Sequence, residues 1–252
     1  MIKTALVTGG SQRVGRSICQ GLAAAGYKVA IHYNSSAAPA EALAAELNEA
    51  YGDGALIAAA VKADLADGAE TRTLMQRAID EVGPIGLLVN NASLFEEDSL
   101  ADIDDEIWDR HFAVHVKAPS LLSSAFAAQK PDDGLIINII DERVWKLTPN
   151  FTSYTLSKST LWTATKTMAQ ALAPNIRVNA IGPGPTLPSY RQTQEDFDEQ
   201  LQALLLKRSP DLSEFTNTIL FYAGAKSVTG QMICLDGGQH LGWQTPDQLA
   251  KE

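Results

Sequence analysis

The sequence predicts an α/β protein in which a doubly wound, mostly parallel sheet of seven strands is flanked by helices. Short apolar runs rich in Val and Ile alternate with helix-length segments rich in Ala and Leu, some of which close with Gly or Pro, as at Gly26 and Pro174. Such apolar runs are typical of strands buried on both faces. Since parallel neighbours need crossover connections, this alternation favours one parallel sheet covered by helices.

Seven strands and the helices between them follow from these runs in order. The expected strands span residues 4–8, 28–33, 55–61, 86–90, 134–140, 176–181 and 231–235. The expected helices span residues 13–25, 39–50, 70–82, 104–129 and 153–172, with two further pieces inside 193–223. Residues 182–192 are too rich in proline for a regular element, so we expect a mobile substrate lid around residues 182–206.

Size and composition indicate one domain over residues 1–252. Of the 252 residues, 45% are hydrophobic, which allows one sizeable core. No apolar run approaches the ~20 residues that span a bilayer, and the N-terminus runs straight into a strand. We therefore expect a cytoplasmic protein without a signal peptide or membrane anchor. A formal net charge of −10 disfavours binding to nucleic acid.

The sequence contains two cysteines, Cys19 and Cys234. Two thiols cannot build a disulfide framework or paired CxxC metal motifs. We expect two buried apolar thiols and no metal site.

A glycine-rich turn joins the first strand to the first helix, in the run Thr8-Gly9-Gly10-Ser11-Gln12-Arg13-Val14-Gly15. Glycines let the backbone turn tightly and approach a pyrophosphate, and the helix N-terminus offers free N–H groups and a favourable dipole. The alternative is a plain glycine-rich turn, but its place between strand and helix favours a Rossmann-type dinucleotide site. We expect Gly9, Arg13, Val14 and Gly15 to contact the cofactor.

The end of the second strand predicts which nicotinamide cofactor is used. It reads His32-Tyr33-Asn34-Ser35 and carries no acid. An Asp or Glu there would bind a free ribose 2′-hydroxyl and repel a 2′-phosphate, so its absence favours NADPH, with NADH as the alternative. Arg13 is the nearest cation in the motifs, and the strand-end residues His32, Tyr33, Asn34 and Ser35 are expected to line the adenosine site.

Two further strand ends carry polar side chains. Asp64-Leu65 follows the third strand, where the carboxylate can accept from an adenine amino group or lie solvated in a loop. Asn91-Ala92-Ser93 follows the fourth strand, at the edge where ligands of doubly wound sheets bind. Asn91 can brace the loop or touch the cofactor.

Tyr154 and Lys158 lie four residues apart at the start of an expected helix, so their side chains share one face. A free phenol has a pKa of about 10 and is a weak proton donor near neutrality, whereas a neighbouring ammonium lowers that pKa. Lys158 can also hold the nicotinamide ribose. The pair therefore predicts proton donation at a catalytic centre.

Together these motifs resemble the short-chain dehydrogenase/reductase family over nearly the whole chain. The matching pieces are the glycine loop at 8–15, Asp64-Leu65, Asn90-Asn91-Ala92, the Tyr154/Lys158 pair, Arg177-Val178-Asn179-Ala180 before Gly182-Pro183-Gly184, and Leu235-Asp236-Gly237-Gly238. Three positions depart from the family pattern. Asp141 replaces the catalytic Ser, Arg13 replaces the middle glycine of the loop, and His115 replaces the Asn of the catalytic tetrad.

Asp141, Arg13 and Phe95 together resemble pteridine reductases and bacterial dihydromonapterin reductases. A pterin is a flat ring with several N–H donors, so it can stack on an aromatic ring and hydrogen-bond a carboxylate. The resemblance implies that Phe95 and the nicotinamide sandwich the pterin, and that Arg13 meets cofactor phosphate and substrate. It further implies Ser93 and Tyr190 as substrate contacts, and Pro183 and Gly184 as cofactor contacts.

By this resemblance the reaction is hydride transfer from NADPH to a C=N bond of a dihydropterin, of the dihydrobiopterin, dihydromonapterin or dihydrofolate kind. Tyr154, assisted by Lys158, and Asp141 deliver the proton to the ring nitrogen. A reductase of another carbonyl or imine is the first alternative. A non-catalytic nucleotide sensor is the second, although such a protein would normally have lost Tyr154 or Lys158.

Two residues keep alternative interpretations. His115 either replaces the family's Asn in a relay of water and backbone or is a satisfied buried imidazole. Trp243 either borders a neighbouring subunit's site or folds onto its own subunit. The family resemblance implies a homotetramer.

Overall fold

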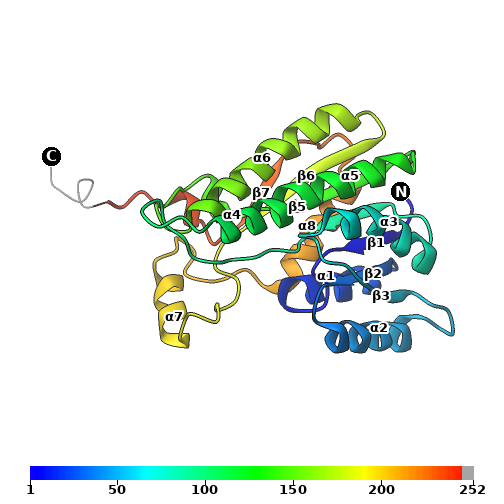
Figure 1. The fold of residues 1–252 in the computed structure, drawn as a ribbon. Helices are drawn as coiled ribbons and strands as arrows, with labels where there is room; N and C mark the ends of the chain where they lie inside the picture. The colour runs from blue at the N-terminus through cyan, green and yellow to red at the C-terminus, as the bar shows by residue number, and fades with distance from the viewer. Residues whose placement is uncertain (246–252) are drawn as a thin grey trace.

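Seven strands form one continuous sheet in the computed structural model, which describes residues 1–245 (Figure 1). They are β1 Thr4–Val7, β2 Lys28–Tyr33, β3 Ala58–Lys62, β4 Leu87–Asn90, β5 Gly134–Ile139, β6 Ile176–Pro183 and β7 Met232–Leu235. Their order is β3-β2-β1-β4-β5-β6-β7, and every neighbouring pair is parallel. The predicted doubly wound fold is therefore confirmed, with a sheet that is entirely parallel.

Helices connect the strands and cover both faces of the sheet (Figure 1). They are α1 Arg13–Ala24, α2 Ala37–Tyr51, α3 Gly68–Val82, α4 Asp105–Phe112, α5 Ala118–Ala128, α6 Thr152–Leu172, α7 Gln194–Gln202 and α8 Leu212–Gly224. Side chains of α1, α2 and α8 form one large buried cluster with the sheet, side chains of α3, α5 and α6 form a second, and a smaller third cluster includes Leu161 of α6. Two layers of helices thus sandwich the sheet.

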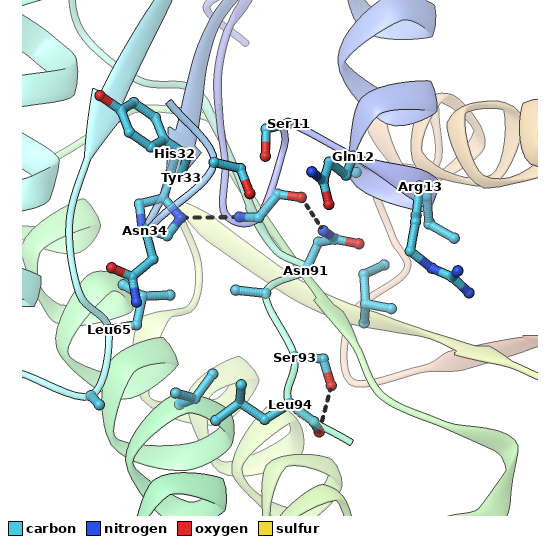
Figure 2. Close-up of a pocket in the computed structure, with 18 of the residues that line it drawn as sticks. Ser11, Gln12, Arg13, His32, Tyr33, Asn34, Leu65, Asn91, Ser93 and Leu94 are labelled. Carbon is cyan, nitrogen blue, oxygen red and sulfur yellow. Dashed lines mark hydrogen bonds between the residues drawn. The ribbon is translucent and has the colours of Figure 1, made fainter. Parts of the chain in front are cut away.

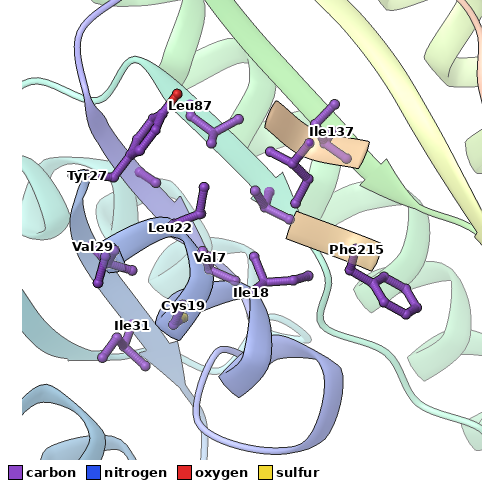
Figure 3. Close-up of a cluster of buried hydrophobic side chains, with 14 of the residues drawn as sticks. Val7, Ile18, Cys19, Leu22, Tyr27, Val29, Ile31, Leu87, Ile137 and Phe215 are labelled. Carbon is purple, nitrogen blue, oxygen red and sulfur yellow. The ribbon is translucent and has the colours of Figure 1, made fainter. Parts of the chain in front are cut away.

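Side chains from several strands gather in the buried cluster that includes α1 (Figure 3). Val7 and Val29 point to the α1 face, where they pack with Ile18, Leu22 and Phe215. The intervening strand residues pack on the opposite face. Each fully buried side chain of this size contributes about 1.5–3 kcal/mol, so both faces are strongly specified. This two-sided burial accounts for the near-continuous apolar runs of the sequence.

The predicted helix over residues 104–129 is continuous in the structure but is not α-helical throughout. Between α4 and α5 the chain forms a π-helical segment, Ala113–Lys117, which we label η1. Pro119 lies just after it and supplies no N–H, while its ring crowds the carbonyl four residues earlier. The wider turn relieves that clash and carries His115 on its inner side, where the residue is 1% exposed.

The third strand begins at Ala58, three residues later than its apolar run predicts. The side-chain amide of Asn48 hydrogen-bonds the backbone there. Its Oδ1 accepts from the N–H groups of Ile57 and Ala58, and its Nδ2 donates to the Ala58 carbonyl. The residues before Ala58 therefore form part of the turn after α2, in which Gly54 adopts a φ of +84°.

The carboxyl ends of the strands meet at one edge of the sheet. The strand order reverses direction between β1 and β4, which creates the crevice where ligands of doubly wound sheets bind. Within residues 1–245, no helix combines the length and apolarity needed to cross a membrane.

Candidate active site

The glycine turn after β1 adopts backbone conformations that its sequence explains. Gly9 has a φ of +60°, and a Cβ on Gly15 would collide with the carbonyl oxygen of Gly9. Arg13 also lies in the left-handed region, with a φ of +49°, which costs an L-residue about 1 kcal/mol. The conformation explains why the family pattern has glycine there.

Neighbouring strand ends hold this turn in place (Figure 2). The Gly9 N–H donates to His32 Nδ1 at 3.0 Å, and His32 Nε2 lies 3.0 Å from the Ala63 carbonyl. Asn91 Nδ2 donates to the carbonyls of Thr8 and Gly9 at 2.8 and 3.1 Å. Burial lowers the pKa of His32 to about 4, so the ring is neutral and both nitrogens are used in bracing.

These hydrogen bonds to the glycine turn leave the N-terminus of α1 open toward a cleft of about 530 Å³. The residue before the helix, Gln12, makes no side-chain cap, so the first N–H groups are free for a phosphate. The cleft brings together most of the predicted cofactor and catalytic residues: Gly9, Arg13, Val14, Gly15, His32, Tyr33, Asn34, Ser35, Asp64, Leu65, Asn91, Ala92, Ser93, Asp141, Tyr154, Lys158 and Pro183. An open helix N-terminus beside tightly turned glycines fits a dinucleotide pyrophosphate.

A second cavity, of about 460 Å³, adjoins the cleft. Arg13, Val14, Asp141 and Tyr154 line both spaces, so the two meet at these side chains. Gly184, predicted at the cofactor, lines the second cavity. Arg13 donates to the carbonyls of Leu187 and Pro188 in the following loop, so in this structure it joins the glycine turn to the predicted lid.

Tyr154 and Asp141 form a direct hydrogen bond at this junction. The Tyr154 hydroxyl donates to Asp141 Oδ2 at 2.7 Å, and the tyrosine is 5% exposed. Burial first, and then the charge of Asp141 and its hydrogen bond, raise the pKa of Tyr154 well above its usual value. The expectation that the pKa of Tyr154 is lowered is therefore wrong in this arrangement, because a carboxylate stabilises the phenol and not the phenolate.

Lys158 is buried beneath the tyrosine. Its Nζ donates to the Ile139 carbonyl at 3.0 Å and lies 5.7 Å from the centroid of the Tyr154 ring. Burial lowers the pKa of Lys158 to about 8, against the opposing effect of Asp141. The ammonium is thus fixed by backbone on the cleft side of Tyr154.

Phe95 lies beside Tyr154 but is already stacked. Its ring stacks on Phe151 with centroids 4.3 Å apart, and it meets the Tyr154 ring in a T-shaped arrangement with centroids 4.7 Å apart. Phe151 has a φ of +58° and lines the second cavity together with Phe95. One face of Phe95 is therefore covered by Phe151, an aromatic partner that the sequence reasoning missed. A large apolar residue three positions before Tyr154 was the signal for it.

Three charged residues of the second cavity were also missed. Glu142 and Arg143 directly follow Asp141, and Arg191 lies in the loop before α7. Their proximity in sequence to a candidate acid and to the predicted lid was the available signal.

Tyr190 does not line either cavity. It is 78% exposed, its hydroxyl donates to Glu96 Oε2 at 3.2 Å, and its ring lies under the Arg191 guanidinium at 4.4 Å. These two contacts direct the side chain outward, so the structure does not bring Tyr190 to the predicted substrate site. Trp243 is 57% exposed, and the proposed contact with a neighbouring subunit stays a prediction.

Two histidines support α6 from the side of α4 and η1. His111 Nδ1 pairs with Ser153 Oγ at 2.7 Å, and His115 Nδ1 pairs with Ser157 Oγ at 2.8 Å. Since the Ser157 hydroxyl donates to the Tyr154 carbonyl, it accepts from His115. His115 Nε2 in turn accepts from the Leu94 N–H at 3.1 Å. The geometry thus favours the interpretation of His115 as a satisfied buried imidazole.

Changing His115→Ala tests that interpretation. Loss of the ring leaves the Leu94 N–H and Ser157 without their partner, so we expect the free energy of unfolding to fall by about 2 kcal/mol. The pH dependence of turnover should stay unchanged, because burial and Lys158 hold the pKa of His115 well below its usual value. Urea denaturation and a pH–rate profile measure both. A changed profile would favour the relay.

Glu142 is 4% exposed, and its Oε2 has no hydrogen-bond partner in residues 1–245. Burial, and then the nearby charges of Asp141 and Asp236, raise its pKa to about 7. Folding therefore favours the protonated acid, and that contribution is lost as pH rises from the unfolded value near 4.5 through 7.

Changing Glu142→Gln should accordingly stabilise the protein more at pH 8 than at pH 5. We expect the difference between the two pH values to be on the order of 2 kcal/mol, after solvent screening. Urea denaturation of both proteins at each pH measures it. Parallel stability curves for the variant and the wild type would contradict a raised pKa at Glu142.

Comparisons with known proteins agree with this geometry. The family model described as short chain dehydrogenase matches residues 3–199. The 3-oxoacyl-[acyl-carrier-protein] reductase FabG of Staphylococcus epidermidis is 32% identical over 248 residues, which cover 96% of this chain and all of that protein.

Two solved structures are similar over nearly their whole length. FolM alternative dihydrofolate reductase 1 from Brucella canis, complexed with NADP, is 54% identical with a TM-score of 0.93, covering 98% of this chain and 97% of that one. A blue fluorescent protein from a metagenomic library, in complex with NADPH, is 33% identical with a TM-score of 0.85, covering 94% and 97%. With its glycine turn, its Tyr154/Lys158 pair and these matches, the chain belongs to the short-chain dehydrogenase family.

Proposed function

We propose that this protein is an NADPH-dependent reductase that reduces a C=N bond of a dihydropterin. The observation that carries the proposal is the hydrogen bond between Tyr154 and Asp141, placed where the cofactor cleft meets a cavity that contains Phe95. The 54% sequence identity between this chain and FolM alternative dihydrofolate reductase 1 supports this substrate class.

The cofactor assignment depends on the end of β2 and on the relatives. No acid follows Tyr33 to repel a 2′-phosphate, and Asn34 and Ser35 line the cleft with groups that donate hydrogen bonds. The FolM structures from Brucella canis and Brucella suis are complexes with NADP, and the blue fluorescent protein is a complex with NADPH. When bound, the reduced nicotinamide supplies the hydride that the substrate carbon accepts.

Tyr154, Asp141 and Lys158 are the residues that transfer the proton to the substrate in this proposal. Removal of the Tyr154 proton would leave a phenolate beside the Asp141 carboxylate, which like-charge repulsion disfavours. A proton taken up from solvent therefore passes to the substrate nitrogen through the pair, which keeps its own Tyr154–Asp141 hydrogen bond before and after the transfer. Lys158, fixed by the Ile139 carbonyl, keeps a positive charge next to this exchange.

The domain organisation, location and assembly of the protein belong to the same proposal. We propose that residues 1–252 act as a single domain in which residues 182–206 close over the substrate, held to Arg13 through the carbonyls of Leu187 and Pro188. We also propose a cytoplasmic homotetramer, on the family resemblance. Size-exclusion chromatography with light scattering would measure the assembly.

A substrate panel tests the function directly. We expect oxidation of NADPH, and slower oxidation of NADH, with dihydrobiopterin, dihydromonapterin or dihydrofolate, measured by absorbance of the reduced nicotinamide. Turnover of simple ketones but of no pterin would replace this proposal with a general carbonyl reductase. Cofactor binding without turnover of any substrate would indicate a sensor.

The variant Asp141→Ser tests the proton pair. It removes the carboxylate that accepts from the Tyr154 hydroxyl, so we expect dihydropterin turnover to fall by about 10²-fold. Equilibrium titration with NADPH, followed by fluorescence, separates a loss of chemistry from a loss of cofactor affinity. A variant with wild-type turnover would remove the main support for pterin reduction, because a hydroxyl would then serve equally well.

A further inference from the structure

Two arginines flank the stacked phenylalanines of the second cavity. The Arg143 guanidinium carbon lies 5.6 Å from the centroid of Phe95 and 5.2 Å from that of Phe151. The corresponding distances for Arg191 are 5.8 and 5.9 Å. Both arginines line the cavity, and their contacts with the rings hold the cations there.

The two arginines differ in how their charges are matched. Arg191 pairs with Glu96 at 2.8 Å and donates to the Phe95 carbonyl at 2.8 Å. The Arg143 guanidinium makes one long hydrogen bond, from Nη1 to Thr148 Oγ1 at 3.4 Å, and its Nε is buried without a partner in residues 1–245. No acid among residues 1–245 forms a salt bridge with Arg143. A charged donor group therefore lies in the cavity without a salt-bridge partner.

Although the chain has a net charge of −10, none of its described acids forms a salt bridge with this guanidinium, so we expect an anionic group of a ligand to bind it. The planar fork of arginine suits a carboxylate, which it can bind through two parallel hydrogen bonds. The reacting bond must lie at Tyr154 and Asp141, and Phe95 makes the pair's contact with Tyr154, whereas Arg143 lies nearest to Phe151, 5.2 Å from its centroid. The group that Arg143 meets is thus a substituent of the substrate and not the reduced ring.

On the basis of the proposed pterin reduction, the structure assigns to Arg143, with Arg191 beside it, the recognition of a carboxylate-bearing tail on the substrate. A cavity of about 460 Å³ lies in the range that holds drug-sized ligands, which leaves room for a tail beyond the bicyclic ring. Phe151 offers an aromatic surface next to the cation for an arylamide in that tail. Dihydrofolate has this chemistry, whereas the side chain of dihydrobiopterin is neutral.

The test compares dihydrofolate with dihydrobiopterin, which share the reducible ring and differ in the tail. For Arg143→Met we expect kcat/KM for dihydrofolate to fall about tenfold through KM, the loss of one charge-assisted hydrogen bond at a half-buried site. The value for dihydrobiopterin should change less than twofold. Arg143→Lys should recover part of the loss, and KM for dihydrofolate alone should rise with salt.

Lys146→Met is the matched control. This exposed cation lies three residues further on, donates to the Gln239 carbonyl and does not line the cavity, so its loss should leave the ratio of the two kcat/KM values unchanged. An equal loss for both substrates in Arg143→Met, or no loss for either, would overturn the assignment.

Binding separates this inference from the proposed function. Calorimetric titration with p-aminobenzoylglutamate, the tail without the pterin, should show weaker binding to Arg143→Met than to the wild type. If the wild-type enzyme reduced no pterin, the proposed function would fail while this titration still tested the carboxylate site. Equal affinity of the two proteins for the tail would overturn the assignment of Arg143.

Discussion

Two histidine–serine hydrogen bonds determine where Tyr154 lies. His111 and His115 are four residues apart on the continuous helix of α4 and η1, and their partners Ser153 and Ser157 are four apart on α6. The equal spacing joins the two helices over one turn and fixes their register. Tyr154 lies between the two serines on that same turn. The packing of the two helices therefore places its hydroxyl beside Asp141.

The parallel sheet supplies the other half of the site. Since every strand runs in the same direction, the residues that follow β1, β2, β4 and β5 meet at one edge. The Thr8 hydroxyl accepts from the N–H groups of Asn91 and Ala92 at 2.9 and 3.0 Å, which ties the glycine turn to the end of β4. The glycine turn is thus anchored to the end of β4, while the N-terminus of α1 stays free for a ligand.

Local pattern was enough to predict the fold and most of the residues that line the cleft beside the glycine turn, because strand periodicity and glycine turns depend on residues that are contiguous in sequence. The second cavity depends on long-range packing and was only partly predictable. The stacking of Phe151 on Phe95 joins residues 56 positions apart, and the outward turn of Tyr190 depends on its contact with Glu96. The direction of the pKa shift of Tyr154 also required the structure, since helical spacing suggested Lys158 as its main neighbour when the contact is with Asp141.

That shift in pKa connects the family's departure at residue 141 to the kind of bond reduced. Reduction of a ketone puts negative charge on oxygen and needs a phenol whose own charge is tolerated, which a neutral hydroxyl and a nearby ammonium provide. A carboxylate hydrogen-bonded to Tyr154 has the opposite effect and makes the phenol a weaker acid. A ring nitrogen is more basic than a carbonyl oxygen and can take its proton from such a pair. The electrostatics at Asp141 therefore suit a C=N bond better than a C=O bond.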